Sequence, residues 1–162
     1  MNKVLFLGLV SALAIGAVVW ISGSRGDSQS SYSDGVLSAS VSDFDFGSIP
    51  MSGGAVSYPF NLTNSSGSPV VINKVYTSCM CTTASVSVGS ASPLGPFGMP
   101  GHTSSTAGLT VPPGESVTVT AVFDPAAHGP AGVGLAERYI YLETNSASNP
   151  KVELRFRALV TN

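Results

Sequence analysis

The chain has 162 residues, which is enough for one domain of ordinary size and one additional segment. Only 10% of the residues are charged and 43% are hydrophobic, so part of the apolar content must lie in a membrane segment or a core. After residue 26 the chain carries five basic and nine acidic residues. A domain with this negative charge repels phosphate, which argues against nucleic-acid binding.

Residues 4–21 form an uncharged apolar run. As a helix this run would span about 27 Å, close to the thickness of a bilayer's hydrocarbon core. We therefore expect residues 1–22 to be a signal anchor that crosses the inner or cytoplasmic membrane once and places the remainder outside the cytoplasm. The alternative is a signal peptide cleaved near Ser22-Gly23-Ser24, which would release a secreted or periplasmic protein.

Residues 23–35 are rich in Ser and Gly and offer little apolar surface to bury. This composition is typical of a flexible linker. It leaves residues 36–162 as the folded domain.

From residue 36 onward, apolar and polar residues alternate in short runs, as expected for half-buried strands. Phe60 and Phe123 are central in two of the clearest runs, and we expect both in the core. Turns rich in Gly, Pro, Asn and Ser separate seven such runs: 36–46, 55–63, 70–76, 82–88, 117–123, 139–144 and 152–160. The pattern predicts an all-β, immunoglobulin-like antiparallel sandwich of about seven strands.

Two segments allow finer expectations. Strict alternation in residues 70–76 would place Val71 and Val75 on one face of a strand and Ile72 on the other. Residues 89–108 carry no charge and read as a long loop. Because exposed apolar side chains gain nothing in a loop, we expect Leu94 and Phe97 to dock onto the sandwich or a partner, near the cysteines.

The only two cysteines, Cys79 and Cys81, stand one residue apart in Ser78-Cys79-Met80-Cys81-Thr82. The favoured interpretation is a pair of structural thiols or a local disulfide at a corner between strands. Extended residues i and i+2 have Cα atoms about 6.5–7 Å apart, near the upper limit for a disulfide, so a bond would require a bend at Met80.

Two further interpretations of the pair involve chemistry. Redox exchange would need a nearby cation to stabilise a thiolate. Binding of a soft metal such as Cu(I) would use both thiolates, with Met99 and His102 as further ligands if the long loop folds back. Neither four-ligand zinc spacing nor a CxxC pair is present.

Other candidate groups are weaker. His128 lies in a turn and is expected to be solvated. Asp43 and Asp45 flank Phe44 and share one strand face, where solvent exposure explains them as well as acid–base chemistry does. No Gly-x-Ser-x-Gly elbow is present to anchor a hydrolase triad. We therefore expect no catalytic residues, no cofactor and no enzymatic activity.

The order of several short motifs resembles a known family, the bacterial domain-of-unknown-function family 1573. The motifs are residues 44–49 (FDFGSI), 60–64 (FNLTN), 72–75 (INKV), 78–82 (SCMCT), 111–115 (VPPGE), 122–125 (VFDP) and 141–145 (YLETN). The resemblance implies an exported domain related to Hydin-like and major-sperm-protein-like immunoglobulin folds, without an assigned activity.

These features together favour a membrane-tethered extracytoplasmic β-sandwich that binds or scaffolds a protein partner in the cell envelope. Such sandwiches can hold partner strands along open sheet edges. The alternative is a module for thiol redox chemistry or copper handling that works through Cys79 and Cys81.

Overall fold

A computed structural model of the chain describes residues 32–162, so the expected anchor at 1–22 and the linker residues 23–31 lie outside the described part. None of the described helices has the length and apolar character needed to cross a membrane. The compact unit begins at Tyr32. The Ser33 N–H donates to the Asn145 carbonyl at 2.8 Å, so the chain contacts the sandwich before the boundary expected at Val36.

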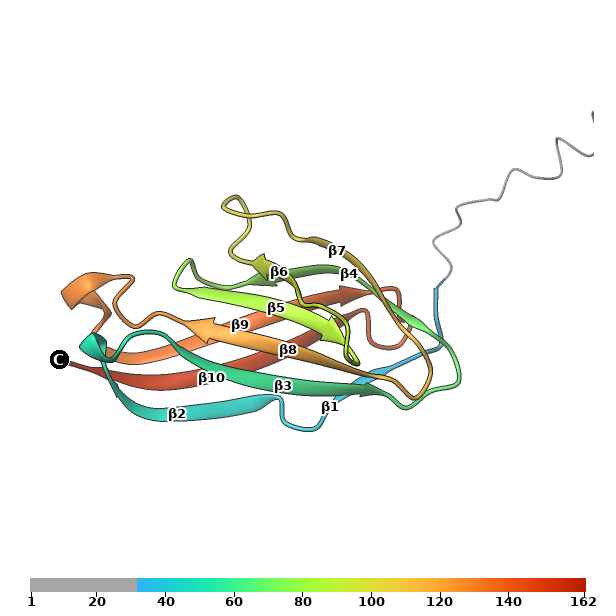
Figure 1. Ribbon diagram of the computed structural model, residues 1–162, viewed down its shortest axis with the longest axis horizontal. Coiled ribbons are helices and arrows are strands. Elements are labelled where there is room, and N and C mark those ends of the chain that lie inside the picture. Colours follow the sequence, from blue (N-terminus) through green and yellow to red (C-terminus); the bar gives the residue numbers. More distant parts are fainter. Residues whose placement is uncertain (1–31) are drawn as a thin grey trace, which may run out of the picture. The chain divides into compact units, whose positions relative to one another are not determined.

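The described residues form ten strands in two five-stranded sheets, which pack face to face (Figure 1). The first sheet has the order β1-β3-β8-β5-β6, and the second has the order β2-β10-β9-β4-β7. The strands are β1 (Leu37–Ala39), β2 (Asp43–Pro50), β3 (Val56–Asn64), β4 (Val70–Thr77), β5 (Thr82–Val88), β6 (Leu94–Phe97), β7 (Thr106–Val111), β8 (Ser116–Phe123), β9 (Gly134–Thr144) and β10 (Lys151–Thr161).

The all-β sandwich is confirmed, but the expected number of about seven strands is wrong. The run at 36–46 divides into β1 and β2, which belong to different sheets, and the segment expected as a long loop contains β6 and the start of β7. The expectation of a wholly antiparallel sandwich is also wrong, because β2 pairs with β10 in parallel. Local alternation reveals a strand without revealing its neighbour or direction.

The expected alternation in residues 70–76 fails within β4. The pairing register shifts between Ile72 and Lys74, so a bulge interrupts the two-residue period. As a result Val70, Ile72 and Val75 are all buried, although strict alternation would place Ile72 and Val75 on opposite faces of the strand.

The core lies between the two sheets and consists almost entirely of aliphatic and phenylalanine side chains. Phe60 is 0% exposed and Phe123 is 2% exposed, which confirms both as core residues. In β6, Phe97 is buried as expected, whereas Leu94 is 42% exposed and is not buried against the sandwich. Val86 pairs with Leu94 and Ala84 with Phe97, so β6 extends the first sheet.

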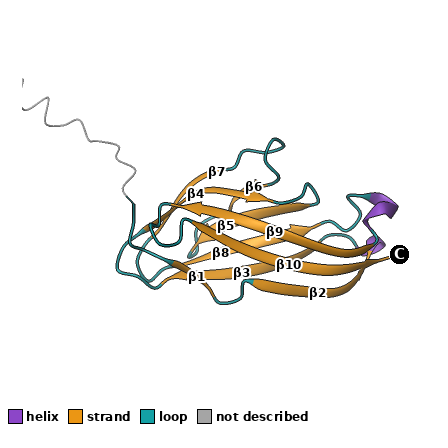
Figure 2. Ribbon diagram, turned by 180° about the vertical axis from the view of Figure 1, so that it is seen from behind, coloured by secondary structure: helices purple, strands orange, loops and turns teal. Residues whose placement is uncertain are grey.

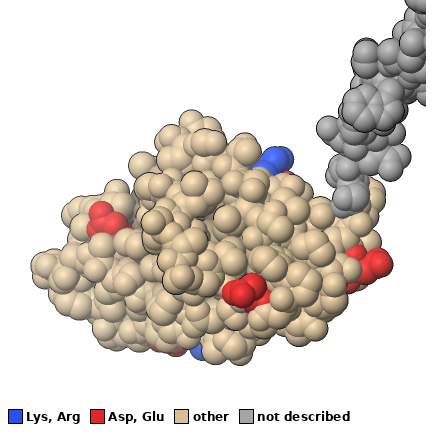
Figure 3. All heavy atoms as spheres, turned by 45° about the vertical axis from the view of Figure 1, so that its right-hand side comes forward, with Lys and Arg blue, Asp and Glu red and all other residues tan. Residues whose placement is uncertain are grey.

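Two short 3-10 turns, η1 (Met51–Gly53) and η2 (Gly129–Gly132), lie at the end of the sandwich that also holds the carboxyl terminus (Figure 2). The connection from β4 to β5 reaches the same end (Figure 1). The surface is sparsely charged on the face that Figure 3 shows, where a few acidic and basic groups stand apart on a neutral background.

Candidate functional site

The two cysteines lie in the tight turn that joins β4 to β5. The Thr82 N–H donates to the Cys79 carbonyl at 3.1 Å and closes the turn. The Thr77 hydroxyl reinforces it, with contacts of 3.1 Å to the Cys79 carbonyl and 3.0 Å to the Thr82 carbonyl. The bend brings the Cys81 N–H to 3.4 Å from the Cys79 Sγ. Both cysteines are free thiols.

His128 reaches this turn from the connection between β8 and β9. The Asp124 N–H donates to the Cys81 carbonyl at 2.9 Å, which ties the start of the connection to the turn. The Asp124 side chain accepts the Ala126 N–H at 2.9 Å and shapes the following bend. His128, just before η2, then places its Nε2 3.2 Å from the Cys79 Sγ.

Arg138 on β9 supplies a cation that contacts the thiol pair. Its Nε donates to the Cys81 Sγ at 3.0 Å, and its Nη1 donates to the Glu137 carbonyl at 2.8 Å. The strand is held beside the turn, because the Ser78 N–H donates to the Tyr139 carbonyl at 3.0 Å. Arg138 shares its side of β9 with the buried residues Ala136 and Ile140.

These contacts push the acidities of the two thiols apart. Partial burial acts to raise the pKa of Cys79, but hydrogen bonds from Cys81 and His128 and the charge of Arg138 outweigh it and lower this pKa from 9.0 to about 7. Burial raises the pKa of Cys81, as does its hydrogen bond with Cys79, and Arg138 opposes both effects. Cys79 is therefore the more acidic thiol and the better nucleophile near neutral pH.

Of the candidates identified from sequence, the structure brings only the two cysteines together, and it adds His128. The Sγ atoms of Cys79 and Cys81 and a ring nitrogen of His128 lie within 4.8 Å of one another. His102 is not part of this group. The long loop does approach the turn, because the Thr77 N–H donates to the Gly98 carbonyl, next to Met99, at 3.1 Å.

Sequence reasoning missed Arg138 and the role of His128. His128 is solvent-exposed, as expected, yet it contacts a thiol. A signal for Arg138 was present, because it lies one residue before the predicted run 139–144. Extending that run by one residue would place an arginine on the face that holds Ile140 and Leu142. Such a residue must find a buried or half-buried partner. No comparable signal marked His128.

The arrangement can support two kinds of chemistry. A thiolate flanked by an imidazole and a guanidinium is a nucleophile suited to thiol–disulfide exchange. Two sulfurs and one imidazole nitrogen are also a ligand set for a soft metal ion.

A second feature is a row of tyrosines on the outer face of the second sheet. The rings of Tyr76 and Tyr141 are 5.1 Å apart, and those of Tyr139 and Tyr141 are stacked at 6.1 Å. The Lys151 Nζ lies 4.0 Å from the centroid of Tyr141. All three tyrosines are half-buried, so each keeps an edge or face open to solvent.

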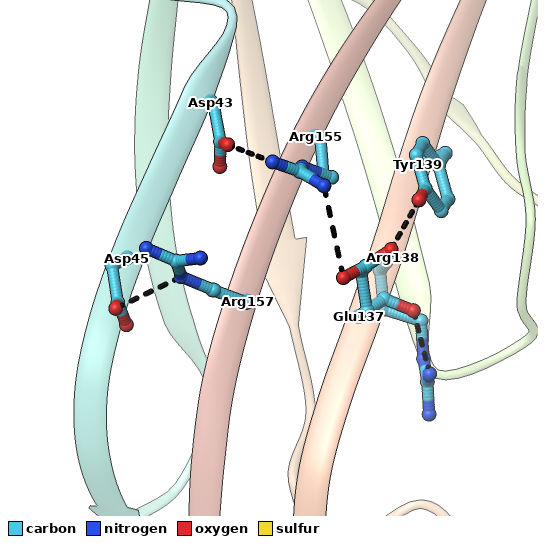
Figure 4. Close-up of polar contacts among 7 residues, drawn as sticks. All are labelled: Asp43, Asp45, Glu137, Arg138, Tyr139, Arg155 and Arg157. Carbon is cyan, nitrogen blue, oxygen red and sulfur yellow. Dashed lines mark hydrogen bonds and ion pairs between the residues drawn. The ribbon is translucent and has the colours of Figure 1, made fainter.

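Ion pairs on the same outer face of the second sheet connect β9, β10 and β2. Asp43 pairs with Arg155, and the Asp45 Oδ2 lies 3.0 Å from the Arg157 Nε (Figure 4). Hydrogen bonding to Arg155 lowers the pKa of Asp43, while the Gly47 N–H and then Arg157 lower that of Asp45. Both carboxylates stay ionised at neutral pH, so neither suits a general acid.

Several solved structures are similar to this chain. A protein of unknown function from Porphyromonas gingivalis W83 is 18% identical, with a TM-score of 0.55 over 77% of this chain and 46% of that chain. The Vibrio cholerae VesB protease is 16% identical, with a TM-score of 0.49 over 77% of this chain and 31% of that chain. The PapD-like domain 7 of human CEP192 is 12% identical, with a TM-score of 0.43 over 85% of this chain and 92% of that chain.

The chain spans less than half the length of the first two structures. At 18% identity, the Porphyromonas protein shows a shared fold and nothing more. No curated protein matches the chain by sequence. Residues 37–94 match the model of the family described as a protein of unknown function (DUF1573), which confirms the resemblance predicted from the sequence motifs.

Proposed function

We propose that the chain is a non-enzymatic binding module of the cell envelope. Residues 4–21 tether it to the membrane, and the β-sandwich lies outside the cytoplasm, where it holds a protein partner. The uncharged apolar run ahead of a compact β unit supports the tether. The tyrosine row on the second sheet is the observation that carries the binding role.

Tyrosine is enriched at the centres of protein interfaces, because it offers a large contact area and a hydroxyl at little cost in conformational entropy. Tyr76, Tyr139 and Tyr141 form a continuous strip on two adjacent strands, β4 and β9. The stacking of these rings and the position of Lys151 over Tyr141 limit their motion, so less freedom is lost when a partner binds.

The sheet edges argue for binding on the face and against strand addition. In the described part of the chain, the outer strands of the first sheet, β1 and β6, have only 3 and 4 residues. Each outer strand of the second sheet contains a glycine with positive φ at a register shift, namely Gly47 (69°) in β2 and Gly108 (60°) in β7. Short strands and bulges are both ways to block edge pairing.

Site-specific photo-crosslinking in native membranes tests this role. A photoreactive phenylalanine analogue at position 141 should crosslink to a discrete protein, whereas the same analogue at position 32 should not. Tyr32 is a matched control, because it is 80% exposed and takes no part in the tyrosine row. The crosslink should also be lost when Tyr76 and Tyr139 are both replaced by Ala. The same crosslinked products from positions 141 and 32 would contradict the proposal.

A second candidate function is supported by a different observation. The convergence of Cys79, Cys81, His128 and Arg138 supports a thiol site for redox exchange or soft-metal binding. Thiol titration and metal analysis of the full chain test this candidate. If both cysteines are unreactive and no metal is bound, this candidate function is wrong and the cysteines are purely structural.

A further inference from the structure

The thiol site combines three potential metal ligands from two separate segments. Cys79 and Cys81 come from the turn between β4 and β5, and His128 comes from the connection between β8 and β9. Their donor atoms all lie within 4.8 Å of one another, so a single ion between them would touch all three after small side-chain movements. The backbone contact from Asp124 to Cys81 holds the two segments together independently of any ion.

The number and type of these ligands narrow the choice of metal. Thiolate sulfur and imidazole nitrogen are soft or borderline donors, which exclude Ca²⁺ and Mg²⁺ as partners. Among the described residues, the group has no fourth member, whether a carboxylate, a histidine or a cysteine. Structural zinc sites almost always use four protein ligands, whereas Cu(I) is well served by soft thiolates.

The charge around the site separates Cu(I) from Zn²⁺. Two thiolates and one Cu(I) carry a net charge of −1, which the guanidinium of Arg138, 3.0 Å from the Cys81 Sγ, balances. With Zn²⁺ the same ligands are neutral, and the half-buried Arg138 charge would be left without compensation. The hydrogen bond from Nε also orients the Cys81 sulfur, as contacts behind metal ligands commonly do.

The ligands differ in exposure in a way that suits loading from solvent. Cys81 is buried, Cys79 is half-buried, and His128 is exposed. An ion can therefore approach on the His128 side and be held against the buried sulfur.

We propose that Cys79, Cys81 and His128 bind one Cu(I) ion in a three-coordinate site, and that Arg138 positions the Cys81 sulfur and balances the charge. This deepens the second candidate function and does not depend on the binding role of the tyrosine row. The two thiol protons leave to solvent as two sulfur–copper bonds form, and the copper stays in the +1 state.

Competition with bicinchoninate tests the proposal, using Cu(I) and the full chain in detergent under anaerobic, reducing conditions. The native chain should take one Cu(I), and X-ray absorption should show two sulfur neighbours and one nitrogen. C79S and C81S should each abolish tight binding. H128A should weaken it at least tenfold, whereas H102A, which removes the only other histidine, should bind like the native chain.

The role of Arg138 is tested by a measurement that a general loss of folding would not change, namely the relative affinity of the site for Cu(I) and Zn²⁺. R138Q should weaken Cu(I) binding and should also lower the ratio of the Cu(I) affinity to the Zn²⁺ affinity. R138K should restore part of that ratio. Equal binding by H128A and the native chain, or displacement of Cu(I) by equimolar Zn²⁺, would overturn the proposal. If metal is not bound but Cys79 still undergoes reversible oxidation, the copper proposal fails while the thiol site remains.

Discussion

Arg138 donates its Nε–H to the Sγ of Cys81 at 3.0 Å from a strand position that otherwise faces the core. A guanidinium cannot lose its charge, so its half-buried position requires an electron-rich partner. Here that partner is a thiol of the Cys79–Cys81 pair. This contact links the second sheet to the turn that leads into the first sheet, and it makes the cysteines electrostatically different from isolated surface thiols.

Alkylation of Cys79 should depend on pH with a midpoint near its lowered pKa. The hydrogen bonds around Cys79 lower its pKa from 9.0 to about 7, so its thiolate forms as the pH rises through 7. Iodoacetamide labelling followed by mass spectrometry should therefore show Cys79 reacting well before Cys81, whose pKa is raised. Equal labelling rates at the two cysteines at pH 7 would contradict this assignment.

Replacing Arg138 by Gln should move the Cys79 midpoint upward, because a positive charge that favours the thiolate is removed. R138K should keep part of the effect. R157Q is the matched control, since Arg157 pairs with Asp45 on the outer face. A midpoint in R138Q that equals the one in R157Q would show that Arg138 does not act on the thiols.

Phe60→Ala should lower the free energy of unfolding by about 3–5 kcal/mol, because a large side chain that is 0% exposed leaves a cavity in the core. Urea denaturation measures the loss. Tyr32→Ala, at a position that is 80% exposed, should change stability by less than about 0.5 kcal/mol. A loss below about 1 kcal/mol for Phe60→Ala would contradict the packing described for β3.

Asn64→Ala should also destabilise the domain, by about 1–3 kcal/mol. Asn64 is fully buried and donates from Nδ2 to the Ser68 carbonyl at 2.9 Å and to the Val111 carbonyl at 3.0 Å. Removing the side chain leaves both carbonyls without this donor. Asn61→Ala at an exposed position of the same strand is the control in the same denaturation experiment, and it should have little effect.

Deleting residues 1–26 should yield a soluble, monomer-sized β protein. Membrane attachment is expected to reside in residues 4–21, because the later apolar runs are short strands of the sandwich. Detergent-phase partitioning and circular dichroism of the shortened chain check the two parts of this expectation. A shortened chain that remained in the detergent phase would place the membrane contact elsewhere.

Much of the sandwich could be predicted from local alternation. The segments Thr82–Val88 and Ser116–Phe123 were recognisable as strands because side chains of a strand point to opposite faces with a period of two. The same rule failed in β4, where a bulge shifts the period between Ile72 and Lys74. It also failed to identify β6, a four-residue strand whose Gly and Pro are typical of loops.

The sequence by itself determined the class of fold, the core phenylalanines and the thiol pair, because each depends on residues that are close together in the chain. Only the tertiary structure decided what surrounds the thiols. His128 contacts Cys79 across a separation of 49 residues, and Arg138 contacts Cys81 across 57. These contacts depend on which strands become neighbours and in which direction they run. Strand pairing is set by the burial of both sheets at once, so no local pattern could have placed an imidazole and a guanidinium beside the Cys-Met-Cys turn.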